Sequence, residues 1–351
     1  MKLLFKKDVV SLRSILFYFW LPFMLYSQQS AWDGPVPGIA PSLEKIAEKF
    51  SEYSVVLEPD KNAAEWWAGA PTVVRGKNGD FWMACRMRSP EHPRGLRGYE
   101  LRILYSSDGV VFEQVHRIHR QDIPIPGFER PAMLIDAQNG LFKFYFCGPW
   151  NAGPWSIMKF DDVDDLQKID PKTAHVVIQA PKKRYERDVS VIEYKDPFIL
   201  YTQEKYHCFV TGYIRRNERI FHFDSDDGEK WSPVGDINQP VMDLQNWHNF
   251  FIRPASVVPL GIGYLFVYEG SSTQWYDPVY NLGTGFGFTF DLHTIVDLTV
   301  DSPIALSSTP SDFYTFRYSH WMLVDGELWV YAEVARPNNS HEIRLYRLKL
   351  Q

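Results

Sequence analysis

The chain has 351 residues, of which 45% are hydrophobic and 16% aromatic, and its formal net charge is −6. This length allows two domains, although single β domains also reach it. Because nucleic-acid binding depends on a basic surface, the negative charge argues against a nucleic-acid partner.

The first 53 residues differ from the rest of the chain. A basic start precedes an apolar run at 15–26, which is too short to span a bilayer, and residues 27–30 suit cleavage. The basic residues are Lys2, Lys6, Lys7 and Arg13. We therefore predict a secretory signal peptide at 1–28, export to the periplasm or the medium, and no membrane attachment after cleavage. Residues 29–53 then form an extension, with an amphipathic helix expected at 42–52.

From residue 66 onwards one segment recurs five times, about once every sixty residues. The copies are Ala-Pro-Thr-Val-Val at 70–74, Arg-Pro-Ala-Met-Leu-Ile at 130–135, Arg-Asp-Val-Ser-Val-Ile at 187–192, Arg-Pro-Ala-Ser-Val-Val at 253–258 and Arg-Tyr-Ser-His-Trp-Met at 317–322. An aromatic-rich run follows each copy, at 81–85, 142–146, 198–201, 264–268 and 328–331. Repeats of this length indicate an array of supersecondary units.

The repeats also predict the kind of unit. Short β-branched and aromatic runs between Gly, Asp, Asn and Pro are typical of strands joined by turns. We therefore predict an all-β fold, a five-bladed β-propeller that forms a single catalytic domain over residues 54–351. The strand-like segment 54–58 is expected to pair beside residues 343–350 in the last blade, which removes two free sheet edges.

Two turns between predicted strands match each other, Ser-Ser-Asp-Gly at 106–109 and Ser-Asp-Asp-Gly at 225–228. Asp suits a tight turn because it accepts bonds from nearby backbone, and Gly accepts a positive φ. An aromatic residue follows three positions after each Gly, at Phe112 and Trp231. We expect these acids to be structural and the aromatic residues to anchor the turns.

Several acidic residues are expected at one rim of the central channel, where the first strand of each blade begins. They are Glu129, Glu186, Asp188 and Glu269, from three different blades. Glycoside cleavage needs two such carboxyl groups, one as acid and one as base or nucleophile. The alternative is that each acid only orients a neighbouring arginine, as the Glu-Arg pairs at 129–130 and 186–187 suggest.

Four blades carry an arginine at an equivalent position: Arg130, Arg187, Arg253 and Arg317. Guanidinium groups crowded near one axis repel each other unless anions neutralise them. Their fork geometry suits a carboxylate or sulfate on a ligand. Internal ion pairs and binding of an acidic sugar are equally compatible with this ring.

Aromatic and histidine side chains near the same rim are further candidates for substrate contact: Trp66, Trp67, His248, Tyr318 and His320. The aromatic content exceeds what a core requires, and the remainder suits stacking on sugar rings. The histidines lack metal-ligand spacing, so we expect no metal site and no cofactor. A structural calcium ion in the channel is left open.

The chain resembles the five-bladed β-propeller glycosidases, which include glycoside hydrolase families 32, 43, 62, 68, 117 and 130. The resemblance covers about residues 60–350 and rests on the blade number and the Asp-Gly turns. It also rests on a stretch similar to the fourth blade of family 130, a family that acts on β-mannosides by phosphorolysis or hydrolysis. That stretch is Gly-Tyr-Leu-Phe-Val-Tyr-Glu-Gly at 263–270, Tyr-Asn-Leu-Gly at 280–283 and Asp-Ser-Pro-Ile-Ala-Leu at 301–306.

Two motifs depart from family 130. Its Glu-Asp-Pro-Arg, whose Asp is the proton donor, is replaced here by Glu-Arg-Pro-Ala at 129–132, and its Tyr-His-Gly by Tyr-Glu-Gly at 268–270. The resemblance therefore implies a glycosidase whose acid comes from elsewhere, and mannoside phosphorolysis is not carried over.

Three hypotheses follow. The first is an exported glycoside hydrolase, exo-acting on an acidic (uronic or sulfated) or aromatic-stacked sugar. In it Asp188 beside Arg187 is the base, Glu269 is the proton donor, and Glu129 is either a donor or an orienting group. The second is a polysaccharide lyase on uronic acid polymers, with Tyr318 or His320 abstracting the proton. The third is a propeller that binds sugars without catalysis; the oligomeric state is open in all three.

Overall fold

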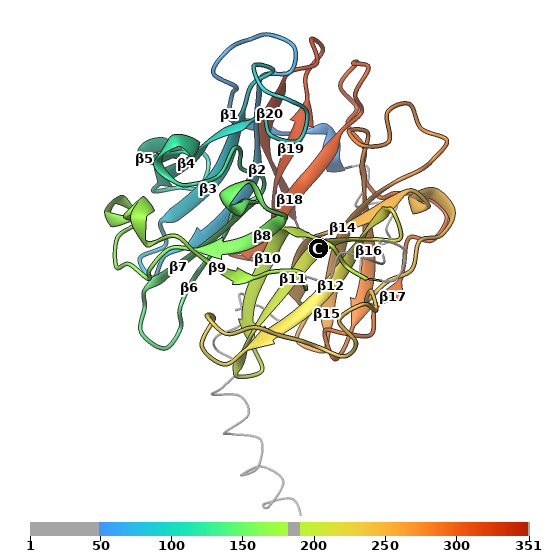
Figure 1. The fold of residues 1–351 in the computed structure, drawn as a ribbon. Helices are drawn as coiled ribbons and strands as arrows, with labels where there is room; N and C mark the ends of the chain where they lie inside the picture. The colour runs from blue at the N-terminus through green and yellow to red at the C-terminus, as the bar shows by residue number, and fades with distance from the viewer. Residues whose placement is uncertain (1–48, 182–189, 350–351) are drawn as a thin grey trace, which may run out of the picture.

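The computed structural model describes residues 49–181 and 190–349, and these ranges are almost entirely β (Figure 1). They contain twenty strands and a few short 3-10 turns, and no α-helix. The expected helix at 42–52 lies mostly outside the described residues, and its last part, Lys49–Ser51, is a 3-10 turn. The predicted signal peptide also lies outside them. Within the described ranges no helix has the length and apolar content needed to cross a membrane.

The strands form antiparallel groups of four, in chain order, which we call units. Unit 1 contains β2 (Trp67–Arg75), β3 (Phe81–Arg88), β4 (Gly98–Ser106) and β5 (Glu113–His119). Unit 2 contains β6 (Ala132–Ile135), β7 (Phe142–Pro149), β8 (Trp155–Lys159) and β9 (His175–Ile178). Unit 3 contains β10 (Tyr194–Thr202), β11 (Lys205–Ile214), β12 (Asn217–Ser225) and β13 (Ser232–Pro233). Unit 4 contains β14 (Phe251–Pro259), β15 (Tyr264–Ser271), β16 (Gly283–Thr289) and β17 (Val296–Asp297). Unit 5 contains β18 (Phe316–Val324), β19 (Glu327–Ala335), β20 (His341–Lys349) and β1 (Ser54–Leu57).

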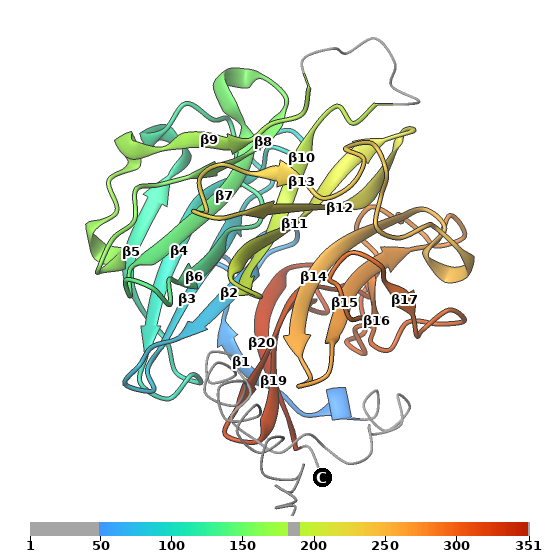
Figure 2. The same cartoon turned by 90° about the horizontal axis from the view of Figure 1, so that it is seen from below.

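The units surround a common centre, with their first strands innermost (Figures 1 and 2). The first strands contact one another in the order β2, β6, β10, β14 and β18, and β18 contacts β2 again. Units 1 and 5 also meet at one parallel pair, Trp67 with His341, which joins them into a single eight-stranded sheet. The start of each first strand is thereby brought to the same place.

The N-terminal strand completes the C-terminal unit. Ser54 pairs with Leu345, and Leu57 pairs with Ile343, so β1 is the outermost strand beside β20. This confirms the predicted pairing of the two ends, except that residue 58 lies outside the strand. The pairing covers an edge of β20 that would otherwise be free to pair with another chain.

Four of the five first strands, β2, β10, β14 and β18, share an irregularity near their starts. Their pairing with the second strand shifts between Gly69 and Thr72, Lys195 and Phe198, Pro254 and Ser256, and Arg317 and His320. In three units a residue inside this shift has a positive φ: 53° at Ala70, 53° at Asp196 and 48° at Tyr318. Such bulges re-aim side chains and are common beside functional sites.

These bulges correct the predicted repeat. The sequence pattern places the third copy at 187–192, but the first strand of unit 3 is β10, so the copy is Lys-Asp-Pro-Phe at 195–198. The aromatic run at 198–201 therefore belongs to the first strand and not to the second. In the predicted repeat, the second residue of each copy made Pro71, Asp188 and Tyr318 equivalent. In the structure the equivalent residues are Ala70, Asp196 and Tyr318, which share a positive φ.

The Asp-Gly turns join neighbouring units. Asp108 accepts bonds from the backbone of Val110 and Val111 at 2.8 and 2.9 Å. The carbonyl of Gly109 accepts the Tyr331 hydroxyl of unit 5, and that of Gly228 accepts the Tyr145 hydroxyl of unit 2. The predicted structural role of these turns is confirmed.

Candidate active site

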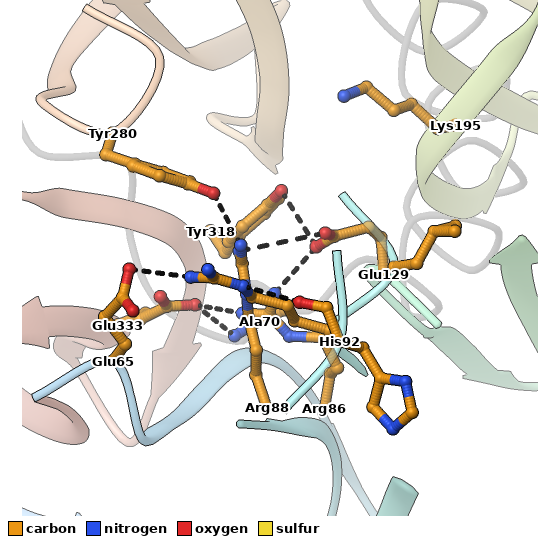
Figure 3. A network of polar contacts seen from close by, with 12 residues as sticks. Glu65, Ala70, Arg86, Arg88, His92, Glu129, Lys195, Tyr280, Tyr318 and Glu333 are labelled. Atoms are coloured by element: carbon orange, nitrogen blue, oxygen red, sulfur yellow. Dashed lines mark hydrogen bonds and ion pairs between the residues drawn. The ribbon is translucent and has the colours of Figure 1, made fainter. Parts of the chain in front are cut away.

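Buried charges gather where the first strands begin (Figure 3). Arg86 on β3 donates to Glu129 at 2.7 Å and to Glu333 at 2.8 Å, which links units 1, 2 and 5. Arg86 and Glu333 are fully buried, and Glu129 is nearly so. Charges are retained at such depth only when they are paired, because their desolvation is costly.

Glu333 on β19 is saturated with partners. Its Oε1 accepts Arg317 at 2.7 and 3.0 Å and His341 Nδ1 at 2.7 Å, and its Oε2 accepts Ala70 N at 3.1 Å. Burial alone would raise the pKa of Glu333, but the arginine charges lower it far below its usual range. A Cβ on Gly69 would lie 1.8 Å from Oε2, so the carboxylate occupies the space a side chain would need. We interpret Glu333 as structural.

Glu129 is held by one oxygen and leaves the other lightly engaged. Its Oε2 accepts Arg86 and also the Tyr318 hydroxyl at 3.4 Å, whereas Oε1 has Arg88 Nη1 at 3.9 Å. Burial raises the pKa of this carboxyl, but Arg86 and Arg88 outweigh it, so the pKa lies below its usual value. Glu129 therefore stays ionised, as a base or nucleophile must.

A second group of ion pairs, partly buried, lies on the unit 3 side. Glu218 on β12 accepts Lys195 at 2.6 Å and Arg253 Nε at 2.5 Å. Burial raises the pKa of Glu218, but these two cations lower it to about 2. Arg253 Nη1 also lies 3.5 Å from the Tyr318 hydroxyl, which connects this group to Glu129.

Asp196 differs from these acids because its carboxyl group has no partner. It is fully buried, and among the described residues neither carboxyl oxygen has a hydrogen-bond partner. Burial raises the pKa of Asp196, and the Glu129 charge adds to this, although Lys195 and Arg253 oppose it. A strained backbone, an unpaired buried carboxyl and a raised pKa together mark a functional candidate.

Glu269 on β15 is intermediate between these two types. Its Oε1 accepts Ser319 N at 2.9 Å, while Oε2 has no partner among the described residues. Burial raises its pKa to about 7, although Arg130 opposes the shift. Glu269 is the cross-strand partner of Arg253, just as Glu333 is the cross-strand partner of Arg317. Each acid also accepts a backbone N–H from the bulge of the next unit, from Ser319 for Glu269 and from Ala70 for Glu333. Glu269 therefore shares part of the structural role of Glu333.

The three described arginines of the predicted ring converge on Tyr318, but their donors bind the protein. Arg317 binds Glu333 and Arg253 binds Glu218. Arg130 donates to the backbone carbonyls of Pro254 and Ala255 at 2.7 and 2.5 Å. Of the two alternatives left open for this ring, internal pairing and an acidic sugar, these contacts favour internal pairing. Glu186, Arg187 and Asp188 lie outside the described residues.

The aromatic and histidine candidates are spread over several places. Trp67 is buried and stacks on His341 at 3.9 Å, whereas Trp66 is partly exposed beside Tyr99. His248 is fully buried, and its Nε2 is bonded to Asp297 at 2.9 Å. Trp67 and His248 therefore both have packing partners inside the protein, and their contact with substrate stays a prediction.

His320 lies beyond the bulge of β18, two residues after Tyr318. Burial lowers its pKa to about 3, and its Nδ1 has no partner among the described residues. It is therefore neutral at ordinary pH. Tyr318 itself stands at the centre of the network, between Glu129 and Arg253.

Lys195, Asp196 and Glu218 were missed as site residues by sequence reasoning. The available signal was Lys-Asp-Pro-Phe at 195–198, whose Pro aligns with Pro71 and Pro131. Within the described ranges no three His, Cys, Asp or Glu side chains gather to hold a metal ion.

No family model matches the chain, and no curated protein matches it. Solved structures do share its fold. BT0996 in its complex with RGII has a TM-score of 0.65 and 12% identity, covering 88% of this protein and 96% of BT0996. A thermostable family-43 glycoside hydrolase has a TM-score of 0.58 and 12% identity, covering 84% and 93%. The α-L-arabinofuranosidase PaAbf62A from Podospora anserina, in complex with cellotriose, has a TM-score of 0.57 and 12% identity, covering 85% and 97%.

The chain therefore has the propeller-like all-β fold of glycoside hydrolases. At such low identity the likeness establishes the fold and not the activity. The resemblance to family 130 stays a prediction.

Proposed function

We propose that the protein is an exported glycoside hydrolase built as a five-bladed β-propeller, with its active centre around Tyr318. The observation that carries this proposal is the contrast between Glu129 and Asp196. Arginines lower the pKa of Glu129, whereas burial without a partner raises that of Asp196. Two carboxyl groups whose environments separate their pKa values are what glycoside hydrolysis requires.

The two acids divide the chemistry. Asp196 donates its proton to the leaving glycosidic oxygen as the bond from that oxygen to the anomeric carbon breaks. Glu129, through its lightly engaged Oε1, removes a proton from the attacking water or attacks the anomeric carbon itself. Water supplies the hydroxyl of the new reducing end in both cases.

Glu269 and Asp188 remain candidates for the same roles. Glu269 has a raised pKa, which suits a donor, but one of its oxygens is committed to Ser319 N. Asp188 stays a proposed base on the sequence argument alone. We favour Asp196 as donor because neither of its oxygens accepts a hydrogen bond from any residue that the structure describes.

We propose an oligo- or polysaccharide with neutral sugars at the cleaved bond. Arg130, Arg253 and Arg317 are bound internally, which leaves no free guanidinium pair among them for a carboxylate or sulfate. Structural neighbours carry RGII or cellotriose in their complexes, which supports a saccharide ligand. Elimination is disfavoured because burial, Asp196 and Glu129 raise the pKa of Tyr318 well above 10, so it is a poor proton acceptor.

The test is a screen of purified protein against neutral, uronic and sulfated oligosaccharides, followed by three matched variants. Glu129→Gln and Asp196→Asn are each expected to lower turnover at least about a hundredfold. Tm should be nearly unchanged in Asp196→Asn, and it should fall in Glu129→Gln because buried Arg86 loses a counter-charge. Asp196→Asn should also remove the loss of rate at alkaline pH, because that loss reports ionisation of the donor. Glu269→Gln should have the smaller effect.

Glu204→Gln, in an exposed turn, is the control. A new reducing end without an ultraviolet-absorbing product supports hydrolysis, and the absorbing product would assign a lyase. If Glu269→Gln abolishes turnover while Asp196→Asn does not, the donor is Glu269. Binding without turnover on every substrate would reject the enzymatic proposal.

A further inference from the structure

We propose that the loop between β15 and β16, residues 272–282, is an oligosaccharide-binding arm on which Tyr276 stacks against a neutral sugar ring. This inference rests on the proposed function and names a second binding place for the same substrate. The C-terminal part of the arm contacts the proposed active centre, because Arg88 Nη2 donates to the Tyr280 hydroxyl at 2.6 Å. The same Arg88 lies 3.9 Å from Glu129 Oε1, and Figure 3 shows Tyr280 beside Tyr318.

The inner part of the arm is held rigidly. The Tyr280 ring has the guanidinium of Arg88 at 5.1 Å from its centroid and that of Arg94 at 4.1 Å. Arg94 also forms an ion pair with Asp277, which ties the arm to the β3–β4 loop of unit 1. Binding surfaces that are ordered in advance lose less entropy when a ligand binds.

Asn281 holds the tip of the arm in place with both ends of its amide. Its Nδ2 donates to the carbonyl of Tyr276 at 2.5 Å, and its Oδ1 accepts Tyr314 N at 2.8 Å. Trp275 stacks on Trp247 at 6.0 Å between centroids. The backbone that carries Tyr276 is therefore fixed on both sides.

Tyr276 itself is left outside this packing, with 72% of its surface exposed. An aromatic ring that is exposed on an ordered loop beside a reactive centre is available for contact with a ligand. Tyrosine also offers a large, amphipathic contact at low entropic cost. The apolar C–H face of a sugar ring matches such a surface.

The arm favours a neutral sugar rather than a charged one. Asp277 follows Tyr276 in the chain, and its charge is neutralised by the ion pair with Arg94. A substrate of several neutral units would therefore place one unit at Glu129 and a more distant unit on Tyr276. The expected consequence is an affinity that rises with chain length.

The test compares arabino-, xylo- and cello-oligosaccharides of two to six units. Tyr276→Ala should weaken binding of six-unit substrates by about five- to tenfold, as a rise in KM, and that of two-unit substrates by much less. Tyr276→Phe keeps the ring and should stay close to the parent protein. Phe290→Ala is the matched control, because Phe290 is 66% exposed in unit 4 but follows the other end of β16.

Equal KM values for Tyr276→Ala and the parent at every length would overturn the inference while leaving the proposed function intact. An equal loss for Phe290→Ala would also overturn it, because any exposed aromatic would then serve. Tryptophan fluorescence of Glu129→Gln, with the same six-unit probes, measures binding without turnover. Length-dependent binding in this variant, together with a parent protein that cleaves none of these substrates, would keep the arm and reject the hydrolase.

Discussion

The two sides of the buried polar network differ in how completely their acids are paired. On the side where units 1 and 5 meet, Glu333 accepts bonds from Arg86, Arg317, His341 and the backbone of Ala70. On the unit 3 side, Asp196 is equally buried, yet its carboxyl has no partner among the described residues.

This difference separates architecture from chemistry. A saturated carboxylate is fixed in charge and place, so it can hold strands together but cannot exchange a proton at ordinary pH. An unpaired buried carboxyl costs stability, and its raised pKa favours the protonated form. Their exposed fractions alone do not distinguish Glu333 from Asp196, because both side chains are fully buried.

The largest expected effect comes from removing the saturated acid. Glu333→Ala leaves Arg317 and Arg86 short of their counter-charge, and we expect a loss of about 3–5 kcal/mol in the free energy of unfolding. Urea denaturation measures it. Asp196→Asn is the matched buried variant, and it should leave stability unchanged or raise it. Equal losses in the two variants would remove the distinction.

A smaller effect is expected from crowding the same carboxylate. Gly69→Ala places a Cβ 1.8 Å from Glu333 Oε2, and overpacking of this kind costs about 1–3 kcal/mol. If crowding is the cause, combining Gly69→Ala with Glu333→Asp should cost less than the sum of the single variants. Strict additivity in thermal melts would show that the two sites are independent.

The smallest effect at neutral pH concerns Glu269 and is visible as a pH dependence. Its pKa is raised from 4.5 to about 7 in the folded protein, so the folded state binds the extra proton. The corresponding stability is fully present below pH 4.5 and is lost as pH rises through about 7. Glu269→Gln should therefore flatten the decline of Tm between pH 4.5 and 8.

Glu218 provides the control of opposite sign. Its pKa is lowered to about 2, so its contribution is present above pH 4.5 and is lost as pH falls towards 2. Glu218→Gln should change the acid limb of the Tm profile and leave the neutral limb alone. These assignments would be contradicted if Glu218→Gln changed Tm between pH 4.5 and 8, or if Glu269→Gln left Tm unchanged over that range.

The sequence predicts the units well, because turns, aromatic runs and strand starts are local signals. It also predicts the pairing of the two ends and places Glu129 and Arg317 in one network. It misses Asp196 because a match of residue types favours Arg-Asp at 187–188, whereas the bulge of β10 identifies Lys-Asp-Pro.

Chain neighbours predict a raised pKa for Glu269, and burial does raise it to about 7. The predicted ionised Asp188 lies outside the described residues and stays a prediction. The state of Glu129 could not be predicted from its chain neighbours. In the fold, the groups that decide a pKa come from other units, as Arg86 of unit 1 does for Glu129. Ion pairs with residues of other strands, rather than chain neighbours, explain why the pKa of Glu333 is lowered while that of Glu269 is raised.

The partnership of β1 with β20 bears on the order in which the protein is made. Ser54 meets Leu345, so unit 5 contains one of the first strands to leave the ribosome and three of the last. Until residue 349 has been synthesised, β1 must remain unpaired while the intervening units form. Pairing of segments so distant in the chain is slow, because the entropy of loop closure is lost before the stabilising contacts form. The final locking of the ring thus waits for β20, and chains cut short before β20 leave both β1 and β2 without the strand that unites them.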